Sequence, residues 1–129
     1  MELWKSVVGY EGLYEVSSRG SVRSLDRWWD QPGPRGGMIR RVCRGQMRLQ
    51  HLDHHGYYKV RIWNKGSSKQ YLVHRLVALA FVENPGNKPT VDHINCVRTD
   101  NRLENLRWAD HLEQRHNRKP ALEKSTPGV

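Results

Sequence analysis

The chain contains the stretch Val91-Asp92-His93-Ile94-Asn95 and, after a short polar segment, Asp100-Asn101-Arg102-Leu103-Glu104-Asn105-Leu106-Arg107-Trp108. An adjacent carboxylate and imidazole thus lead into a polar loop, and the loop closes on Asn105 before apolar and polar residues begin to alternate. Alternation of this kind predicts a strand. Residues 90–109 are therefore expected to form a hairpin around the loop.

A helix is predicted directly after this hairpin. Asp110 and Glu113 fit a capping box, in which the first side chain accepts a hydrogen bond from a backbone N–H and the second reaches back. The helix is expected to end near Lys119, and residues 120–129 are expected to form a flexible tail. Hairpin and helix together would hold a carboxylate, an imidazole and amide oxygens around one small volume, which suits one divalent metal ion and a water molecule.

Hydrolysis of a phosphodiester is the chemistry that fits these groups. The reaction must deprotonate a water, offset the charge on the phosphate oxygens and stabilise the leaving 3′ oxygen, and one divalent metal ion can do the last two. A neutral imidazole can do the first if an acceptor holds its other nitrogen. Neighbouring residues on a strand point to opposite faces. The convergence of Asp92 and His93 therefore requires irregular backbone near Ile94 and Asn95.

The composition favours nucleic acid as the partner. The chain has 22 Lys and Arg residues against 13 Asp and Glu residues, a formal net charge of +9, with five Trp and five Tyr interleaved. Such a composition is typical of nucleic-acid binding, and no basic amphipathic helix that could bind an anionic membrane is evident. No apolar run approaches the roughly 20 residues of a membrane helix, and no signal peptide is evident. A cytoplasmic protein with no membrane partner is expected.

The length and the cysteines limit the architecture. A chain of 129 residues, of which 36% are hydrophobic, can form one compact domain or two small lobes that share a modest core. Cys43 and Cys96 lie far apart in the sequence and form no Cys-x-x-Cys pair, so no structural zinc is expected. Reduced thiols are favoured, and a disulfide between the two stays open.

The N-terminal part is predicted to consist mostly of strands. Residues 13–17 and 21–25 alternate on either side of Ser18-Arg19-Gly20, which predicts a hairpin whose glycine adopts a positive φ. Pro and Gly are frequent in residues 26–41, which predicts a long, mobile loop. Two interpretations of Trp28-Trp29 stay open: the rings cap the small core, or they stack on nucleotides beside arginines.

Further strands are predicted over residues 42–52, 57–63 and 69–73. In the middle one, Tyr58, Val60 and Ile62 would share a face, and Lys59, Arg61 and Trp63 would face the other way.

A short apolar helix is predicted over residues 73–82, buried on most of its surface. His74 at its start is interpreted as a hydrogen-bonded structural histidine rather than a ligand. His51, His54 and His55 are interpreted as polar residues near a turn rather than as a metal site, because no cysteine or carboxylate cluster supports them.

Two parts of the sequence resemble known families. The run from Val91 to Trp108 resembles the HNH nuclease motif, with its ββα-metal fold, because several non-apolar residues match at fixed spacing. An upstream set resembles the NUMOD4 module that accompanies HNH domains in phage and intron-encoded homing endonucleases, and residues 74–81 resemble the linking helix of those proteins. The upstream set comprises Leu3-Trp4-Lys5, Gly9-Tyr10-Glu11-Gly12-Leu13-Tyr14-Glu15-Val16-Ser17 and Gly20-Ser21-Val22-Arg23-Ser24. The resemblance covers roughly residues 2–118.

The resemblance implies a role for three residues of the hairpin. Asp92 would bind the metal ion, His93 would be the general base, and Asn105 would hold the loop between the two strands so that His93 stays oriented. The implied cofactor is one divalent metal ion, Mg²⁺ or Mn²⁺.

The second protein ligand would come from the final helix, where this chain departs from the commonest family pattern. Gln114 stands where the resemblance leads one to expect Asn, and its amide oxygen can still bind a hard cation. Asn117 lies on the same helical face and stays open as an alternative ligand, as do His111 and His116.

Double-stranded DNA is the expected partner, because arginines flank the hairpin and continue into the N-terminal part. Two-stranded ribbons can also enter a DNA groove. The arginines predicted to bind DNA are Arg19, Arg23, Arg27, Arg44, Arg61, Arg98, Arg102, Arg107, Arg115 and Arg118.

The predicted fold class is α+β. An N-terminal antiparallel β lobe of the NUMOD4 type over residues 1–72 would precede a short linking helix and a C-terminal ββα-metal HNH motif, which together span residues 73–119. The expected function is that of a metal-dependent DNA endonuclease of homing type, acting as a monomer or weak homodimer in a phage-infected bacterial cell. Two alternatives stay open: a non-catalytic DNA-binding protein on a decayed HNH scaffold, and a low-specificity HNH nuclease for phage DNA packaging or degradation, with a phage terminase as partner.

Overall fold

The computed structural model describes residues 1–110. The helix predicted after Asp110 and the tail lie outside these residues. The described chain is mostly strand, with one α-helix and one short 3-10 helix. In chain order the elements are β1 (Trp4–Ser6), β2 (Tyr14–Ser17), β3 (Val22–Ser24), β4 (Arg27–Pro32), β5 (Met38–Cys43), β6 (Gln50–Leu52), β7 (Tyr58–Asn64), β8 (Ser67–Leu72), α1 (Val73–Phe81), β9 (Thr90–His93), η1 (Leu103–Asn105) and β10 (Leu106–Ala109).

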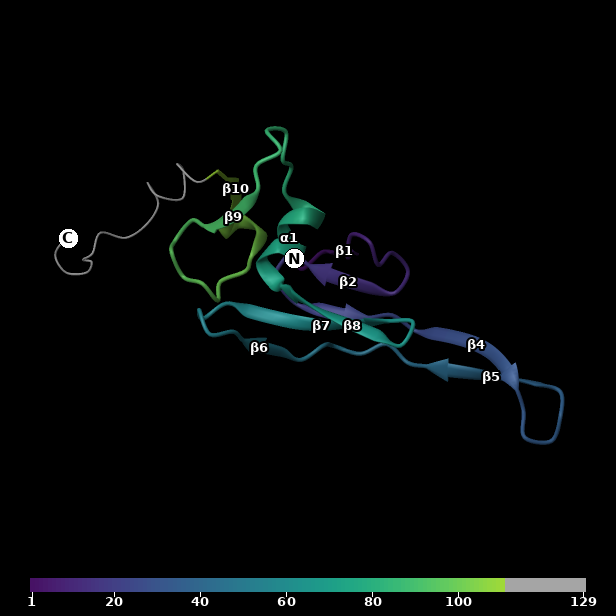
Figure 1. Ribbon diagram of the computed structural model, residues 1–129. Helices are drawn as coiled ribbons and strands as arrows, with labels where there is room; N and C mark the ends of the chain where they lie inside the picture. Colours follow the sequence, from purple (N-terminus) through teal and green to yellow (C-terminus); the bar gives the residue numbers. More distant parts are fainter. Residues whose placement is uncertain (111–129) are drawn as a thin grey trace, which may run out of the picture.

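Within residues 1–110 the strands pair into four small antiparallel sheets (Figure 1). Their strand orders are β1-β2-β3, β4-β5, β6-β7-β8 and β10-β9. Each strand pairs with its neighbour in the sequence, so every sheet is a hairpin or a meander. The chain between β5 and β6 adds to the first sheet, because Ser24 N–H donates to Gln46 O at 2.9 Å and Arg48 N–H donates to Val22 O at 2.8 Å.

Helix α1 lies at the centre of the core (Figure 1). Its residues Val73, Leu76 and Val77 are buried, and it packs against β1, β2, β7, β8, β9 and β10. The predicted apolar helix is therefore confirmed. Three of the four sheets contribute to the same buried cluster, which includes Val16, Val22, Val60, Ile62, Val91, Leu106 and Trp108. The cluster joins residues before and after position 72, and the division of the chain into two domains stays a prediction.

The alternation predicted for the central strand is confirmed in β7. Val60 and Ile62 are each 1% exposed, whereas Arg61 and Trp63 on the other face are exposed. The predicted hairpin in the first sheet also forms, with Val16 opposite Val22. Its turn places Gly20 at φ +91°, as predicted.

The prediction of a long, mobile loop over residues 26–41 is wrong. The strands β4 and β5 form a regular hairpin that projects from the body of the molecule (Figure 1). Proline and glycine are tolerated because Pro32 ends its strand and residues 33–37 form the turn. Arg40 supports the pairing, since it lies over the ring of Trp28 at 3.8 Å and pairs with Asp30 at 3.1 Å.

The first interpretation of Trp28 and Trp29 is also wrong. Their side chains are 60% and 47% exposed, so neither ring caps the core. The strand predicted over residues 42–52 is likewise divided: β5 ends at Cys43, and β6 begins at Gln50. Gly45 lies in the break, where its backbone packs so closely that an added Cβ would lie 2.4 Å from Ser24 O.

The structure also bears on the two cysteines and on membrane-spanning segments. No disulfide joins Cys43 and Cys96. Across the described part of the chain, no helix has the length and apolar character to cross a membrane.

The central position of α1 predicts a contrast between two leucines on that helix. Leu76 is 3% exposed and Leu79 is 46% exposed. Leu76→Ala is expected to lower the free energy of unfolding by about 2–5 kcal/mol, because it leaves a cavity in the core. Leu79→Ala should change it by less than about 1 kcal/mol. Urea denaturation followed by tryptophan fluorescence measures both, and equal losses would contradict the central role of α1.

Candidate active site

Strand β9 gives Asp92 and His93 different surroundings. Its pairing with β10 places Arg107 opposite Asp92 and Leu106 opposite His93. Asp92 Oδ2 lies 3.4 Å from Arg107 Nη2, whereas the His93 side chain is turned inward and is 5% exposed. The strand ends at His93, and Cys96 then adopts φ +64° with its N–H donating to His93 O at 2.9 Å. The irregular backbone predicted at this point is confirmed.

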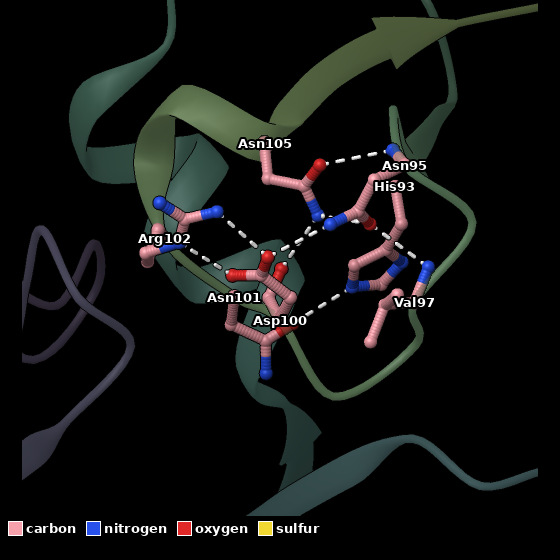
Figure 2. A network of polar contacts seen from close by, with 7 residues as sticks. All are labelled: His93, Asn95, Val97, Asp100, Asn101, Arg102 and Asn105. Atoms are coloured by element: carbon pink, nitrogen blue, oxygen red, sulfur yellow. Dashed lines mark hydrogen bonds and ion pairs between the residues drawn. The ribbon is translucent and has the colours of Figure 1, made fainter.

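His93 meets the side chain of Asn101 inside the loop (Figure 2). Nε2 of His93 lies 2.7 Å from Oδ1 of Asn101, and Asn101 is 4% exposed. No role for Asn101 is predicted from the sequence. No pattern in the sequence distinguishes it from the other asparagines of this polar loop, because only the path of the loop decides which amide reaches the imidazole.

Asn105 joins the two sides of the loop between β9 and β10 (Figure 2). Its Oδ1 accepts a hydrogen bond from Asn95 N–H at 3.0 Å, and its Nδ2 donates to Asn95 Oδ1 at 2.9 Å and to Asp100 O at 2.8 Å. Its own carbonyl accepts from Ile94 N–H at 2.8 Å. The buried amide is thus fully hydrogen-bonded, and it closes the loop at both ends. Its influence on His93 stays a prediction.

A second set of contacts in this loop centres on Asp100. Its two carboxylate oxygens accept hydrogen bonds from Nε and Nη2 of Arg102, both at 2.8 Å, and Oδ2 also accepts from Asn95 Nδ2 at 2.9 Å. The hydrogen bonds from Arg102, followed by that from Asn95, hold the pKa of Asp100 well below its usual range. Asp100 is therefore ionised at neutral pH.

Three aromatic rings pack together at His93. The ring centroids of Tyr57 and His74 lie 5.7 Å and 4.8 Å from that of His93, and 5.1 Å from each other. Burial lowers the pKa of His74 to about 4, with a smaller contribution from neighbouring His93. His74 is thus neutral at neutral pH. The hydrogen bond predicted for it does not form at Nδ1, which has no partner among the described residues; ring packing surrounds it instead.

The predicted metal site lies only partly within the described residues. Asp92 offers a carboxylate, a hard oxygen donor of the kind that Mg²⁺ and Mn²⁺ prefer. No group of three or more His, Cys, Asp or Glu side chains is arranged for a metal ion in residues 1–110. The remaining candidate ligands Gln114, Asn117, His111 and His116 lie outside the described residues. The choice among them stays a prediction.

The arginines predicted to bind DNA fall into groups with different contacts. Arg19 and Arg44 are exposed on loops, and Arg44 lies 3.5 Å from Asp26. Arg23 pairs with Glu15 at 2.6 Å, and Arg61 donates to Ser68 Oγ at 2.7 Å. The other described members, which also contact the protein itself, are Arg27, Arg98, Arg102 and Arg107. Arg115 and Arg118 lie outside residues 1–110.

Comparison with known families agrees with this arrangement of the chain. A model of the NUMOD4 motif matches residues 2–63, and a model of the HNH endonuclease matches residues 71–116. The chain thus contains a segment similar to the NUMOD4 motif, followed by a segment similar to HNH endonucleases. Its HNH segment contains α1, β9, η1 and β10, and so includes His93, Asn101 and Asn105. Its NUMOD4 segment contains the first sheet and the β4–β5 hairpin.

Known HNH endonucleases are similar to this chain over most of its length. DNA endonuclease I-HmuI of Bacillus phage SP01 is 31% identical over 105 residues, which are 81% of this chain and 51% of the relative. An HNH endonuclease of Acanthamoeba polyphaga mimivirus is 35% identical over 117 residues, 87% of this chain and 25% of the relative. A solved structure, described as DNA binding and cleavage by the HNH homing endonuclease I-HmuI, matches 98% of this chain and 62% of that chain, with a TM-score of 0.72 and 28% identity. This chain thus spans about half the length of I-HmuI and a quarter of the viral relative.

The burial of His74 predicts a pH dependence of stability. Its pKa of about 4 in the folded protein lies below the value of 6.5 expected for the unfolded chain, so the unfolded state binds more protons between these two values. The free energy of unfolding therefore falls as pH drops from about 6.5 to about 4, by up to about 3 kcal/mol for a shift of this size. His74→Phe should remove this part of the pH dependence.

Urea denaturation of both proteins at several pH values between 4 and 7 measures the difference. His54→Phe is the matched control, because His54 lies on an exposed turn. The same pH dependence in the wild type and in His74→Phe would contradict the assignment of a buried, neutral imidazole.

Proposed function

We propose that this protein is a metal-dependent DNA endonuclease of homing type that nicks one strand of a duplex. The observation that carries the proposal is the buried contact between His93 and Asn101, inside a loop that Asn105 closes and directly beside Asp92 on β9. The comparison with I-HmuI supports it, because that relative is described as a DNA endonuclease and its structure as one of DNA binding and cleavage.

The proposed reaction uses His93 as the general base. A water attacks the phosphorus, its oxygen forms the new bond, and His93 takes its proton. The bond from phosphorus to the 3′ oxygen of the neighbouring nucleotide breaks in the same displacement. A positioned general base typically contributes about 10²–10⁴-fold to the rate. The imidazole must be neutral to act as a base, and its ring packs against those of Tyr57 and His74.

Asp92 would hold one divalent metal ion, Mg²⁺ or Mn²⁺, together with a ligand from the segment after Asp110. When bound there, the ion would offset the charge of the phosphate oxygens and stabilise the leaving 3′ oxygen. Arg107 lies 3.4 Å from Asp92 Oδ2 and adds positive charge beside the same carboxylate. One such site acts on one strand at a time, so a monomer would nick and two copies would be needed for a double-strand break.

The N-terminal part would position the DNA. The β4–β5 hairpin projects from one end of the molecule, and β9 and β10 lie toward the other end (Figure 1). Arg35, Arg40, Arg41 and Arg44 are all exposed on or beside this hairpin, and the net charge of the chain is +9. A duplex that touches both ends would be held mainly through its phosphates.

The catalytic part of the proposal predicts metal-dependent nicking. Supercoiled plasmid incubated with the protein and Mg²⁺ or Mn²⁺ should convert to open circles, and EDTA should stop the conversion. His93→Ala is expected to lower the rate by about 10²–10⁴-fold, because the general base is lost. Asp92→Asn should also lower it, and higher metal concentration should partly restore the rate.

His51→Ala serves as the matched histidine control, since His51 is an exposed residue of β6. It should cleave at the wild-type rate. Nicking that persists in EDTA, or that survives His93→Ala, would contradict the proposed mechanism. Tight DNA binding without cleavage in either metal would support a non-catalytic DNA-binding protein instead.

The DNA-positioning part predicts a strong salt dependence. If about six phosphates are neutralised, a plot of log K against log salt should have a slope of about −5. Arg41 is exposed on β5 opposite Trp29, and Arg41→Ala should make the slope less steep by about 1 while weakening all DNA sequences alike. Fluorescence anisotropy with a labelled duplex measures both, and a slope near zero would contradict extended phosphate contact.

A further inference from the structure

We propose that the NUMOD4 turn formed by Ser18, Arg19 and Gly20 is part of the catalytic apparatus: it holds Asn101 in place, and Asn101 sets the position of the proton on His93. This inference rests on the proposed function of His93 as a general base. It makes Asn101 and Gly20 positioning residues that act on the base from the N-terminal module, in addition to any contact that this module makes with DNA.

A buried hydrogen bond connects Asn101 to the imidazole of His93. Asn101 Oδ1 lies 2.7 Å from His93 Nε2, and the two residues are 4% and 5% exposed. An amide oxygen can only accept a hydrogen bond, so Nε2 must carry the proton. In a neutral imidazole the lone pair is then on Nδ1, which becomes the nitrogen that takes a proton from water. A change at Asn101 would therefore alter which nitrogen is basic as well as the orientation of the ring.

Asn101 in turn packs closely against Gly20 of the turn. Gly20 has φ +91°, and a Cβ added there would lie only 2.8 Å from Cβ of Asn101 and 3.3 Å from its carbonyl oxygen. Such a separation is shorter than van der Waals contact between carbon atoms, which have their optimum at about 3.5–4.0 Å. The backbone of Asn101 can occupy its position only because residue 20 has no side chain.

Hydrogen bonds hold the turn itself in place. Ser17 Oγ accepts hydrogen bonds from Arg19 N–H at 3.1 Å and from Ser21 N–H at 3.0 Å, so the turn is closed from inside. Gly20 O accepts from Gln50 Nε2 at 2.7 Å. Ser17 and Ser18 are 0% and 6% exposed. These contacts tie the turn both to its own hairpin and to β6, and they restrict its movement.

A backbone hydrogen bond also joins the turn directly to the HNH loop. Leu103 N–H donates to Ser18 O at 2.9 Å, and Leu103 begins η1, which leads to Asn105. The turn thus contacts the loop on both sides of Arg102, at Asn101 and at Leu103. The HNH segment matched by the family comparison starts at residue 71, so this support for its general base comes from outside that segment.

Two glycine substitutions provide the test. Gly20→Ala introduces both the strain of a positive φ and the clash with Asn101. Gly9→Ala is the matched control, since Gly9 has φ +90° and an added Cβ would meet no atom within 4 Å. Both variants experience similar backbone strain, so the difference between them reports the contact with Asn101.

Three measurements are made on each full-chain variant: the single-turnover nicking rate of supercoiled plasmid with Mn²⁺, the Kd for a labelled duplex, and the ¹⁵N chemical shifts of the His93 ring. Gly20→Ala is expected to lower the rate about 10–100-fold, the range that misplacement of a reacting group by about 1 Å can cause. Its Kd should stay within twofold, and its ring shifts should move from the form protonated on Nε2 toward a mixture. Gly9→Ala should match the wild type in all three. Equal rates in the two variants, or a lower rate in Gly20→Ala with unchanged ring shifts, would overturn the proposal.

A second pair of variants keeps the proposal testable if Gly20→Ala fails to fold. Asn101→Asp retains an acceptor for Nε2–H and should cleave within about tenfold of the wild type, whereas Asn101→Leu should lose at least about 100-fold. Equal losses in the two would overturn the role of Asn101 as an acceptor. The wild-type ¹⁵N spectrum separates this inference from the proposed function: a His93 protonated on Nε2 in a chain that cleaves no DNA would leave the positioning contact intact and refute only the nuclease. A His93 protonated on Nδ1 would overturn the inference itself.

Discussion

The burial of α1 is the constraint on which the rest of the described structure depends. A two-stranded hairpin alone is at best marginally stable in water, and small sheets gain stability by packing against a helix. The chain has four sheets of two or three strands within residues 1–110. Three use the same helix as their common core, so Val16, Val60 and Val91 meet around α1 although they belong to different sheets. Each fully buried side chain of this kind contributes about 1.5–3 kcal/mol. The NUMOD4 and HNH segments consequently share one hydrophobic core. This core fixes the position of the candidate active site around His93.

Polar contacts play the corresponding part in the loop between β9 and β10. This loop has little regular secondary structure, so its backbone groups depend on side chains for hydrogen bonds. Asn105 supplies three of these bonds with one buried amide, and Asp100 and Asn95 complete the set. An unsatisfied buried polar group costs about 1–3 kcal/mol, whereas an exposed ion pair contributes at most about 1 kcal/mol. Asn105 therefore matters more to the shape of the loop than the ion pairs on the surface do.

The β4–β5 hairpin does not depend on the hydrophobic core, because none of its side chains is buried. Trp28 packs against Arg40 across the two strands, and neither Trp28 nor Trp29 is buried in the core. A mobile loop was predicted here because Pro32, Gly33, Pro34, Gly36 and Gly37 lie close together in the sequence. Those residues occupy the end of one strand and the turn, and the residues on either side can pair. A hairpin that leaves its aromatic and cationic side chains in solvent offers them to a partner, and for a chain of charge +9 the electrostatics favour a polyanion.

The sequence by itself determined the buried helix, the alternation in β7 and the positive φ of Gly20. All of these are local: they depend on spacing, periodicity or the absence of a Cβ, which the order of residues states directly. Only the tertiary structure decided that Asn101 is the acceptor at His93 and that Gly20 touches Asn101. It also decided that His74 packs against His93 with an Nδ1 that has no partner within residues 1–110. These contacts join residues far apart in the chain or inside an irregular loop, where neither a helical nor a strand period indicates which side chains will meet.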